Sequence, residues 1–353
     1  MRLVVTGGAG FIGNALVHAL VAQGHDEIVV IDKLTYASCP ESLATLQGRP
    51  GYRLVEADIG DAGALRAVFD AVRPHAVLHL AAETHVDRSI DGPGDFIRSN
   101  VTGTAVLLDA ALDYWRTRSP KAQDDFRFVH VSTDEVYGPA PENGAFREGD
   151  PYAPSSPYAA SKAASDHLAL AWNRTYGLPV VLSLCTNNYG PWQFPEKLIP
   201  LSLVRAMRGQ PIRIYGDGRQ VRDWLHVDDH VRGLLAILQR GRVGERYHLG
   251  AGQEATNLEL VGMVLAALAQ LRPPKGAAYE TLIRHVADRP GHDRRYALDS
   301  SKSRKELDWA PQLSLADGLA EAVRWYVEHE DWWRPILDGR YGGERLGLSV
   351  ASG

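Results

Sequence analysis

Short apolar runs alternate with amphipathic segments along the first part of the chain. The runs cover residues 2–6, 27–31, 52–56, 75–80 and 126–131. Between the third and fourth runs, residues 61–72 have the apolar spacing expected of a helix. Apolar runs of this length, separated by helical segments, are typical of parallel strands buried on both faces of a sheet. The pattern predicts an α/β fold with a doubly wound, Rossmann-type parallel sheet.

The pattern becomes less regular further along the chain. We expect helices near residues 94–116, 158–176, 226–239 and 315–330, strands at 179–184 and 246–250, and a glycine-rich tail after Trp333. Residues 187–197 are too rich in turn formers for a strand or helix, so a second lobe is expected to begin there. The lobes are then interleaved: residues 1–186 plus about 224–250 form the Rossmann-type domain, and residues 187–223 plus about 251–353 form a smaller C-terminal lobe.

The composition of the 353-residue chain is that of an ordinary globular protein. It is 45% hydrophobic and 23% charged, and a net charge of −5 without a long basic run argues against a nucleic-acid partner. The sequence contains neither a membrane-length apolar stretch nor the apolar core of a signal peptide, so a cytoplasmic protein is expected. Cys39 and Cys185 have no metal-ligand spacing, and no metal site is expected.

A glycine-rich turn follows the first apolar run. Gly7, Gly10 and Gly13 would let the backbone turn tightly, let a pyrophosphate approach the next helix, and let that helix pack on the sheet. Alone, such a turn is often only a loop. Here the second run ends in Asp32, whose carboxylate can bind adenosine ribose hydroxyls and would repel a 2′-phosphate. The pattern favours NAD over NADP, although the neighbouring Lys33 weakens that inference.

Other residues follow strand ends, where ligands bind in open α/β sheets. Asp58-Ile59 follow the third run and Ala81-Ala82 the fourth. For the alanines, close packing is as good an explanation as cofactor contact. His79 and His130 lie inside predicted strands and are expected to be buried, hydrogen-bonded core residues.

The fifth run ends abruptly in Ser132-Thr133-Asp134-Glu135. Two carboxylates and two hydroxyls at a strand end are candidates for acid–base chemistry, and a solvated turn is an equally good interpretation of these residues alone. Adjacent strand residues point to opposite faces, so Asp134 and Glu135 can reach one ligand only if the strand ends or twists there. Gly138 and the prolines after it favour such a break.

Tyr158 and Lys162 are four residues apart at the start of a predicted helix and so share one face. An ammonium group there can lower the pKa of the phenol and make a phenolate available as a base. Alone, this spacing mostly reflects packing and surface residues. After a glycine-rich turn and a Ser-Thr-Asp-Glu strand end, it indicates a catalytic pair.

Polar groups also gather in the predicted loops of the second lobe. Cations and amides on loops suit a diphosphate and a sugar. These are Arg213, Tyr215, Arg222, Asn257 and residues 288–296. For any one of them alone, an ordinary solvated loop charge is the better explanation.

Together these motifs resemble the extended short-chain dehydrogenase/reductases and, within them, the nucleotide-sugar 4,6-dehydratases, nearest to those that act on dTDP-glucose. The resemblance covers nearly the whole chain. It rests on residues 7–13, 82–89, 132–138, 158–162, 187–191, 195–200, 222–224 and 288–293. The Thr-Asp-Glu triplet at 133–135 discriminates, because related epimerases and decarboxylases lack this acidic pair. The loop at 37–40 and Trp192 depart from the family pattern.

The resemblance implies a catalytic role for five residues. Tyr158, activated by Lys162, would take the C4 hydroxyl proton while a hydride passes from C4 to NAD, with Thr133 bonded to the developing 4-keto oxygen. Glu135 would then take the C5 proton, and a protonated Asp134 would donate to the leaving C6 hydroxyl before the hydride returns to C6. Two carboxyls can hold opposite protonation states where their environments separate their pKa values.

The resemblance also implies the binding residues and partners. The cofactor is expected to be NAD, bound by Gly7, Gly10, Phe11, Ile12, Gly13, Asp32, Lys33, Leu34, Thr35, Asp58, Ile59, Leu80, Ala81, Ala82, Thr84, Ser99, Val131, Tyr158, Lys162 and Asn188. The substrate is expected to be dTDP-glucose, bound by Thr84, Thr133, Asn187, Lys197, Leu198, Arg213, Ile214, Tyr215, Arg222, Asn257, Asp288, Arg289, His292 and Tyr296. A homodimer is expected, with the helices near 94–116 and 158–176 at its interface; no membrane partner is expected.

Two other interpretations stay open. A UDP-sugar epimerase or decarboxylase of the same fold would be favoured if Asp134 and Glu135 lay far from C5 and C6 of the sugar. A non-catalytic NAD-binding protein is disfavoured because Tyr158 and Lys162 are both present. The sequence names neither the nucleotide base nor the pathway.

Overall fold

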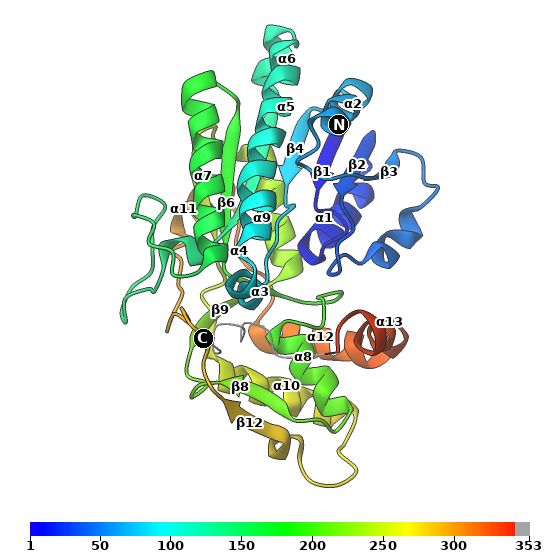
Figure 1. The fold of residues 1–353 in the computed structure, drawn as a ribbon, viewed down its shortest axis with the longest axis vertical. Coiled ribbons are helices and arrows are strands. Elements are labelled where there is room, and N and C mark those ends of the chain that lie inside the picture. Colours follow the sequence, from blue (N-terminus) through cyan, green and yellow to red (C-terminus); the bar gives the residue numbers. More distant parts are fainter. Residues whose placement is uncertain (343–353) are drawn as a thin grey trace.

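The structure, a computed structural model, describes residues 1–342. A large sheet with helices on both faces occupies one end, and a smaller group of helices and short strands lies beyond the carboxyl ends of its strands (Figure 1). The α/β class predicted from the alternating pattern is confirmed.

The main sheet has seven parallel strands in the order β10-β6-β5-β4-β1-β2-β3. The strand order reverses between β1 and β4, and in open α/β sheets ligands bind in the crevice at such a switch point. The strands are β1 (Arg2–Thr6), β2 (Glu27–Asp32), β3 (Tyr52–Glu56), β4 (Ala76–His79), β5 (Arg127–Thr133), β6 (Val180–Cys185) and β10 (Arg246–Leu249).

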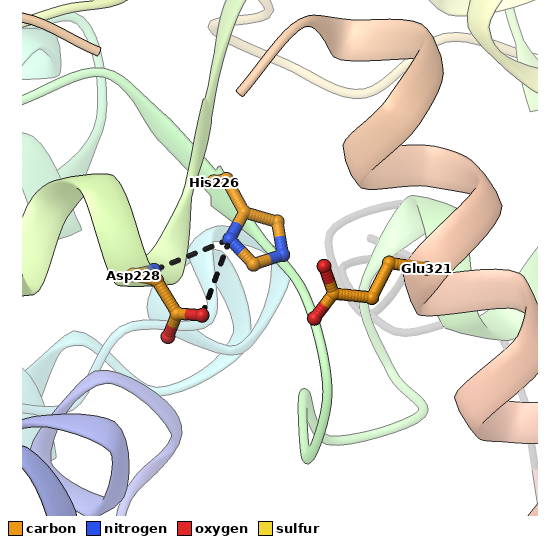
Figure 2. Close-up of side chains that lie close together, drawn as sticks. All are labelled: His226, Asp228 and Glu321. Carbon is orange, nitrogen blue, oxygen red and sulfur yellow. Dashed lines mark hydrogen bonds and ion pairs between the residues drawn. The ribbon is translucent and has the colours of Figure 1, made fainter. Parts of the chain in front are cut away.

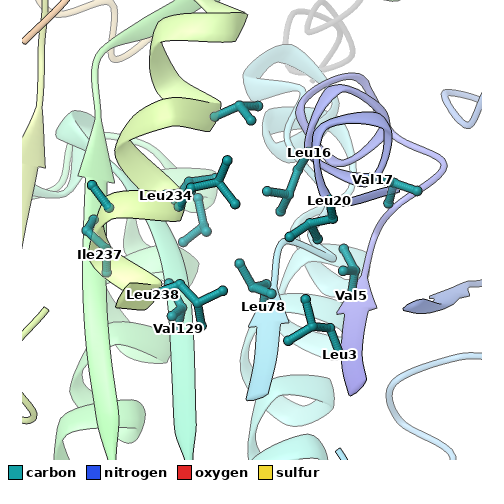
Figure 3. Close-up of a cluster of buried hydrophobic side chains, with 14 of the residues drawn as sticks. Leu3, Val5, Leu16, Val17, Leu20, Leu78, Val129, Leu234, Ile237 and Leu238 are labelled. Atoms are coloured by element: carbon teal, nitrogen blue, oxygen red, sulfur yellow. The ribbon is translucent and has the colours of Figure 1, made fainter. Parts of the chain in front are cut away.

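Both faces of this sheet are buried, because alternate strand residues pack against different helices. Leu3 and Val5 of β1 join a core with Leu16 and Leu234 from helices on one face (Figure 3). Val4 lies in a second core on the opposite face. The first face carries α1 (Phe11–Ala22) and α9 (Val227–Arg240), and the second carries α2 (Ala62–Val72), α5 (Thr104–Arg116) and α7 (Pro157–Tyr176).

The smaller lobe contains a three-stranded sheet, a two-stranded sheet and a core of its own. Its strands are β7 (Asn187–Tyr189), β9 (Val221–His226) and β11 (Glu254–Thr256), then β8 (Ile212–Tyr215) and β12 (Ile283–Val286). Its helices are α8 (Leu198–Met207), α10 (Asn257–Leu271), α12 (Leu315–Glu328) and α13 (Glu330–Pro335). As expected, α9 and β10 return to the first sheet; the domain limits themselves stay a prediction.

Shorter elements connect these. The helices are α3 (Val86–Asp91), α4 (Pro93–Phe96), α6 (Pro120–Asp124) and α11 (Ser301–Leu307). The 3₁₀ segments are Pro40–Leu46, Asp134–Tyr137 and Tyr279–Leu282, and the π-helical segments are Ile97–Gly103 and Ile336–Arg340. Among the described residues, none of the helices combines the length and hydrophobicity needed to cross a bilayer.

Two predicted elements differ from the structure. Residues 187–197, expected to be irregular, begin with β7, which pairs in parallel with β9 through Asn187 and Trp224. A three-residue strand inside a turn-rich segment has no local signal, because its partner is distant in sequence. The helix expected at 94–116 is interrupted by the π-helical segment before α5. Of the predicted glycine-rich tail, residues 343–353 lie outside the described part.

A buried histidine joins the lobes. The Asp228 N–H, at the start of α9, donates to Nδ1 of His226 at 3.3 Å, and the Asp228 carboxylate lies 3.9 Å from that nitrogen. Figure 2 shows Nε2 on the other side of the ring, facing Glu321 of α12. The imidazole therefore lies between carboxylates of two helices that belong to different parts of the fold.

Candidate active site

The acidic pair follows directly after the central strand. β5 ends at Thr133, and Asp134–Tyr137 form a 3₁₀ turn. The Thr133 hydroxyl donates to Asp134 at 3.1 Å and accepts from the Glu135 N–H at 3.3 Å. Gly138 ends the turn with a φ of 77°, and a Cβ there would lie 2.2 Å from the Ala153 carbonyl oxygen. Because the strand has ended, Asp134 and Glu135 both line one cleft.

Burial governs the ionisation of this pair. Burial first, and then the charge of Glu135, raise the pKa of Asp134 to about 8. Burial also raises the pKa of Glu135, while Arg289 and Arg222 oppose that shift. One oxygen of each carboxyl, Asp134 Oδ2 and Glu135 Oε2, is buried and has no hydrogen-bond partner among residues 1–342. Unsatisfied buried oxygens beside cations are typical of a site that binds a polar ligand.

Tyr158 and Lys162 reach the same cleft from α7. Pro157 occupies the first turn of this helix, and the Ser156 hydroxyl caps it by accepting from the Ala159 N–H. The Thr133 hydroxyl lies close enough to Tyr158 to oppose the rise in the pKa of the phenol. The Lys162 ammonium donates to the Val131 carbonyl of β5 at 2.8 Å.

The pKa of the Tyr158 phenol is shifted upward, not downward as predicted from its spacing to Lys162. Burial, followed by the charge of Glu135, raises the pKa of Tyr158 well above its usual value. Burial lowers the pKa of Lys162. Four-residue spacing placed both groups on one helix face, but burial and nearby acidic groups outweigh any effect of the ammonium on the phenol. Tyr158 therefore holds its proton in this structure.

A cavity of about 310 Å³ extends from the glycine-rich turn to the acidic pair. It is lined by every predicted cofactor residue except Leu34, namely Gly7, Gly10, Phe11, Ile12, Gly13, Asp32, Lys33, Thr35, Asp58, Ile59, Leu80, Ala81, Ala82, Thr84, Ser99, Val131, Tyr158, Lys162 and Asn188. Leu34 has a φ of 53°, its side chain packs on the core, and its N–H donates to Asp32 at 2.9 Å.

The glycine-rich turn has the close contacts that its sequence predicts. A Cβ on Gly13 would lie 2.1 Å from the Gly7 carbonyl oxygen, and one on Gly7 would lie 2.6 Å from the Ala81 nitrogen. The helix that follows, α1, is described in full and has neither a side-chain cap nor an acidic residue in its first turn. Its N-terminal N–H groups are thus available to an anion, which fits a dinucleotide pyrophosphate.

Asp32 lies at the end of β2 with 7% of its surface exposed. Its carboxylate accepts from the Ala9 N–H at 3.0 Å and from the Ser38 hydroxyl at 3.0 Å. Lys33 does not pair with it: its ammonium bonds Ser99 at 2.7 Å and Glu83 at 3.1 Å. The Asp32 carboxylate is thus not paired with Lys33, and a carboxylate at this position of the cleft disfavours a 2′-phosphate.

Some of the predicted substrate residues meet at the acidic pair. Thr84, Thr133, Asn187 and Lys197 line the cleft. The Lys197 ammonium donates to the Thr84 carbonyl at 3.1 Å and so joins the lobes. Arg222 and Arg289 lie close enough to Glu135 to oppose the rise in its pKa.

Tyr296 is also beside Glu135, whose charge, after burial, raises the pKa of Tyr296. The Arg222 guanidinium stacks over the Tyr296 ring at 4.2 Å. This pair forms one wall next to the carboxylate.

Other predicted substrate residues hold the wall together. Asp87 accepts from the Tyr215 hydroxyl at 2.7 Å and from Arg289 at 2.9 Å. Asp288 lies 2.6 Å from Nδ1 of His292. These contacts fix the cations of the second lobe near the sheet.

Ten of the fourteen predicted substrate residues do not line the cleft. Six of them belong to the wall described above, namely Tyr215, Arg222, Asp288, Arg289, His292 and Tyr296, and the other four lie elsewhere. Ile214 is buried in the core of the second lobe, and Leu198 packs against that core. The side chain of Arg213 is exposed on β8. Asn257 begins α10, where its N–H donates to the Gln220 carbonyl. Ile214 and Arg213 point to opposite faces because they alternate on the short strand β8, and Asn257 is used to begin a helix. The polar composition of these segments, which suggested loops, did not reveal either element.

Sequence reasoning missed several residues that line the cleft. They are Ile31, Ala37, Ser38, Ala57, Glu83, Cys185, Thr186, Gln193, Phe194 and Glu196. Glu196 is buried, accepts from the Tyr36 hydroxyl at 3.0 Å and lies 3.7 Å from Nε2 of His85. The sequence did contain a signal for Glu196, because this residue lies in the 195–200 motif. That motif was used only for the resemblance to the family, and no role was assigned to Glu196.

The two strand histidines are buried as expected. Both ring nitrogens of His79 have partners, the Thr6 hydroxyl at 2.7 Å and the Thr104 hydroxyl at 3.0 Å. His130 bonds Asp166 through Nε2 at 3.0 Å, but its Nδ1 has no partner among the described residues. The prediction of a fully hydrogen-bonded histidine is therefore confirmed for His79 and wrong for His130.

Comparison with known proteins identifies the family. The family model described as GDP-mannose 4,6 dehydratase matches residues 4–322. A dTDP-glucose 4,6-dehydratase of Xanthomonas campestris pv. campestris is 51% identical over 348 residues, which are 98% of this chain and 99% of that protein. The chain belongs to the nucleotide-sugar 4,6-dehydratase family. Its predicted place among the extended short-chain dehydrogenase/reductases is confirmed.

Solved structures of this family have the same architecture. A crystal structure of the dTDP-glucose 4,6-dehydratase DesIV from Streptomyces venezuelae, with NAD bound, has a TM-score of 0.87 and 49% identity, and the match covers 95% of this chain and all of that chain. A UDP-glucose 4-epimerase from Thermotoga maritima, crystallised with UDP-glucose, matches with a TM-score of 0.82 and 29% identity over 94% of this chain and all of that chain. The shared fold therefore hosts both reactions, and the site must distinguish them.

Proposed function

We propose that this protein converts dTDP-glucose to dTDP-4-keto-6-deoxyglucose and water. One observation carries the proposal: Asp134, Glu135 and Tyr158 line the same cleft, which continues to the glycine-rich turn. Oxidation at C4 needs a base at the C4 hydroxyl, and loss of water across C5 and C6 needs a base and an acid. The cleft holds three groups for these three proton transfers.

The cofactor is proposed to be NAD. Its pyrophosphate would be held by the uncapped N-terminus of α1, and its adenosine ribose by Asp32. When bound, NAD accepts a hydride from C4, brings a positively charged ring to the site, and returns the hydride to C6, so that it is regenerated in each turnover. Lys162 is expected to contribute to holding it.

The chain's own residues handle the protons. Tyr158 takes the C4 hydroxyl proton as a phenolate, which requires the positive charges of Lys162 and of the bound nicotinamide ring to offset the upward shift that burial gives its pKa. The Thr133 hydroxyl donates to the oxygen as it becomes a ketone. Glu135 removes the C5 proton, which the 4-ketone acidifies. Burial and the charge of Glu135 raise the pKa of Asp134 to about 8, so this carboxyl is protonated at neutral pH. Asp134 gives its proton to the departing C6 hydroxyl.

The second lobe is proposed to hold the nucleotide. Arg222 and Arg289 place positive charge beside Glu135, as a diphosphate next to the sugar requires. Asn187 and Lys197 line the cleft at the boundary of the lobes. Four other predicted residues of this lobe, Tyr215, Asp288, His292 and Tyr296, belong to or support the wall beside Glu135.

The epimerase alternative requires the acidic pair to lie far from the reacting sugar carbons. Both carboxyls instead share the cleft with Tyr158, and the Thr133 hydroxyl donates to Asp134. This arrangement favours dehydration over epimerisation.

We also propose a homodimer, with the outer faces of α5 and α7 at the interface, and a cytoplasmic location, where NAD and nucleotide sugars are available. Size-exclusion chromatography with light scattering would test the dimer. Substitution of the half-exposed Ile97, next to α5, by Asp is expected to shift the protein toward the monomer.

Mass spectrometry in deuterated water tests the proposed reaction. Purified protein is incubated with dTDP-glucose and no added reductant. The expected product has lost one water and gained one deuterium at C5. Unchanged substrate mass with NAD bound would contradict the proposal, and a parallel reaction with UDP-glucose tests the choice of base.

A further inference from the structure

A buried carboxylate of α7 lies behind the site and contacts β5 directly. Asp166 follows Lys162 by one helical turn and is 0% exposed. Its Oδ1 lies 3.0 Å from Nε2 of His130, and its Oδ2 accepts from the Ser132 hydroxyl at 2.8 Å and from the Tyr152 hydroxyl at 2.9 Å. The carboxylate thus has partners on β5 and on the loop before α7, all of them able to donate.

These contacts join the two elements that carry the catalytic groups. His130 and Ser132 are two residues apart on β5 and so point to the same face, toward α7. The carbonyl of Val131, between them, accepts from Lys162 at 2.8 Å. Successive turns of α7 therefore bond β5 just before Thr133, where the strand ends. These hydrogen bonds between α7 and β5 hold Tyr158, on the helix, next to the acidic pair that follows the strand.

Asp166 is also the acidic residue nearest to Lys162 in the sequence of α7. Burial lowers the pKa of the Lys162 ammonium, and the charge of Asp166 is the largest influence opposing that shift. The other titratable groups whose charges interact with Lys162 are His79, His130 and Cys185, from β4, β5 and β6.

None of those three supplies a negative charge near neutral pH. Burial lowers the pKa of both His79 and His130, which leaves their rings neutral. Burial raises the pKa of the Cys185 thiol to about 12, and burial keeps the Tyr158 phenol protonated as well. Of the groups named here, Asp166 is therefore the one whose charge favours the ammonium form of Lys162.

We propose that Asp166 is a positioning residue of the site: its carboxylate keeps the buried Lys162 charged and fastens α7 to the end of β5. The catalytic consequence rests on the proposed dehydratase function, whereas the effect on Lys162 does not. The charge of Asp166 and its hydrogen bonds to neighbouring elements can be tested separately, because different substitutions remove them.

Four variants make the test. Asp166→Asn removes the charge and nearly preserves the shape, and Asp166→Glu restores the charge. Tyr152→Phe removes one hydrogen bond to Asp166 and leaves its charge in place. Asp109→Asn is the matched control, because Asp109 also bonds α7, through the Trp172 ring N–H at 3.1 Å, but on the exposed side.

Two readouts distinguish charge from structure. For Asp166→Asn we expect kcat to fall roughly tenfold or more with little change in KM, and the alkaline limb of the pH profile to move to lower pH. Asp166→Glu should return the limb toward its original position. Tyr152→Phe and Asp109→Asn should leave the limb unmoved. The Nζ signal of Lys162 in 15N-lysine-labelled protein, assigned with Lys162→Arg, should lose its ammonium character at lower pH in Asp166→Asn.

An Asp166→Asn variant that keeps the wild-type kcat and the wild-type titration of the Lys162 signal would overturn the inference. An equal loss of the ammonium signal in Tyr152→Phe would overturn the charge role as well. If wild-type protein fails to dehydrate dTDP-glucose while Asp166→Asn still shifts the Lys162 signal, the proposed function is wrong and the role of Asp166 stands.

Discussion

Asp134 and Glu135 are adjacent carboxyls that cannot both ionise readily in their buried turn. Burial and the charge of Glu135 raise the pKa of Asp134 to about 8, whereas Arg289 and Arg222 favour the charged form of Glu135. The structure thus places two chemically similar side chains in different electrostatic environments, because Arg289 acts on Glu135 and the charge of Glu135 acts on Asp134. An elimination needs that difference, because it uses one acid and one base.

Substitution of Glu135 by Gln should separate oxidation from elimination. The amide cannot accept the C5 proton, but Tyr158 and Thr133 are untouched. We expect kcat for dehydration to fall by roughly 10²–10⁴-fold, while reduced cofactor still forms after substrate is added. Deuterium exchange at C5, followed by NMR in deuterated water, should disappear. Normal exchange in this variant would assign the C5 base to another residue.

The stability of Asp134→Asn relative to the wild-type protein should increase as the pH rises. The folded-state pKa of about 8 lies above the ordinary 3.8, so this group contributes stability below about pH 4 that is lost progressively as the pH rises to about 8. Asn cannot ionise, so the Tm advantage of the variant should grow across that window. Thermal unfolding at pH 5 and pH 8 measures it, with exposed Asp70→Asn as the control. An equal Tm difference at both pH values would argue against a raised pKa.

Alanine at two glycines of the turn should have different consequences. A Cβ at Gly13 would lie 2.1 Å from the Gly7 carbonyl oxygen, whereas one at Gly10 meets only that same oxygen, at 3.3 Å. Gly13→Ala is expected to lower the free energy of unfolding by roughly 2–4 kcal/mol and to abolish NAD binding. Gly10→Ala should fold nearly normally and bind NAD more weakly. Urea unfolding and calorimetric titration with NAD check both, and a normally stable Gly13→Ala would contradict the packing.

Acid should destabilise the fold through its buried histidines, and His248 provides a test. Burial lowers its pKa to about 4, below the ordinary 6.5, so the stability it contributes is present above pH 6.5 and is lost as the pH falls toward 4. Its ring bonds the Tyr137 hydroxyl at 2.8 Å.

His248→Gln should cost about 1–2 kcal/mol at pH 7 but should lose less stability than wild type between pH 6.5 and pH 4.5. Exposed His285→Gln serves as the control, and urea unfolding at the two pH values gives the comparison. Parallel losses in wild type and His248→Gln would mean that other groups dominate acid unfolding.

The sheet and the glycine-rich turn were predictable because their signals are local. Runs of apolar residues identify buried strands, and Gly7, Gly10 and Gly13 show where the backbone must approach a neighbour. The end of β5 was predictable in part: the sequence showed that Asp134 and Glu135 could share a ligand only if the strand stopped, and the 3₁₀ turn after Thr133 is how it stops.

Features that depend on distant partners were not predictable. β7 exists because β9 lies beside it, and Ile214 is buried because strand alternation turns it toward the core of the second lobe. The direction of the pKa shift of Tyr158 was also missed. Spacing along a helix places Lys162 nearby, but only the folded structure reveals burial and the carboxylates that face the phenol.

One isotope-transfer measurement tests the central claim most directly. dTDP-glucose carrying deuterium at C4 is converted by the purified protein, and the product is analysed by NMR and mass spectrometry. The account predicts that water is lost and that the deuterium appears at C6, within the same sugar molecule. A product that keeps the original mass, or that loses the C4 deuterium to solvent, would contradict dehydration by internal hydride return.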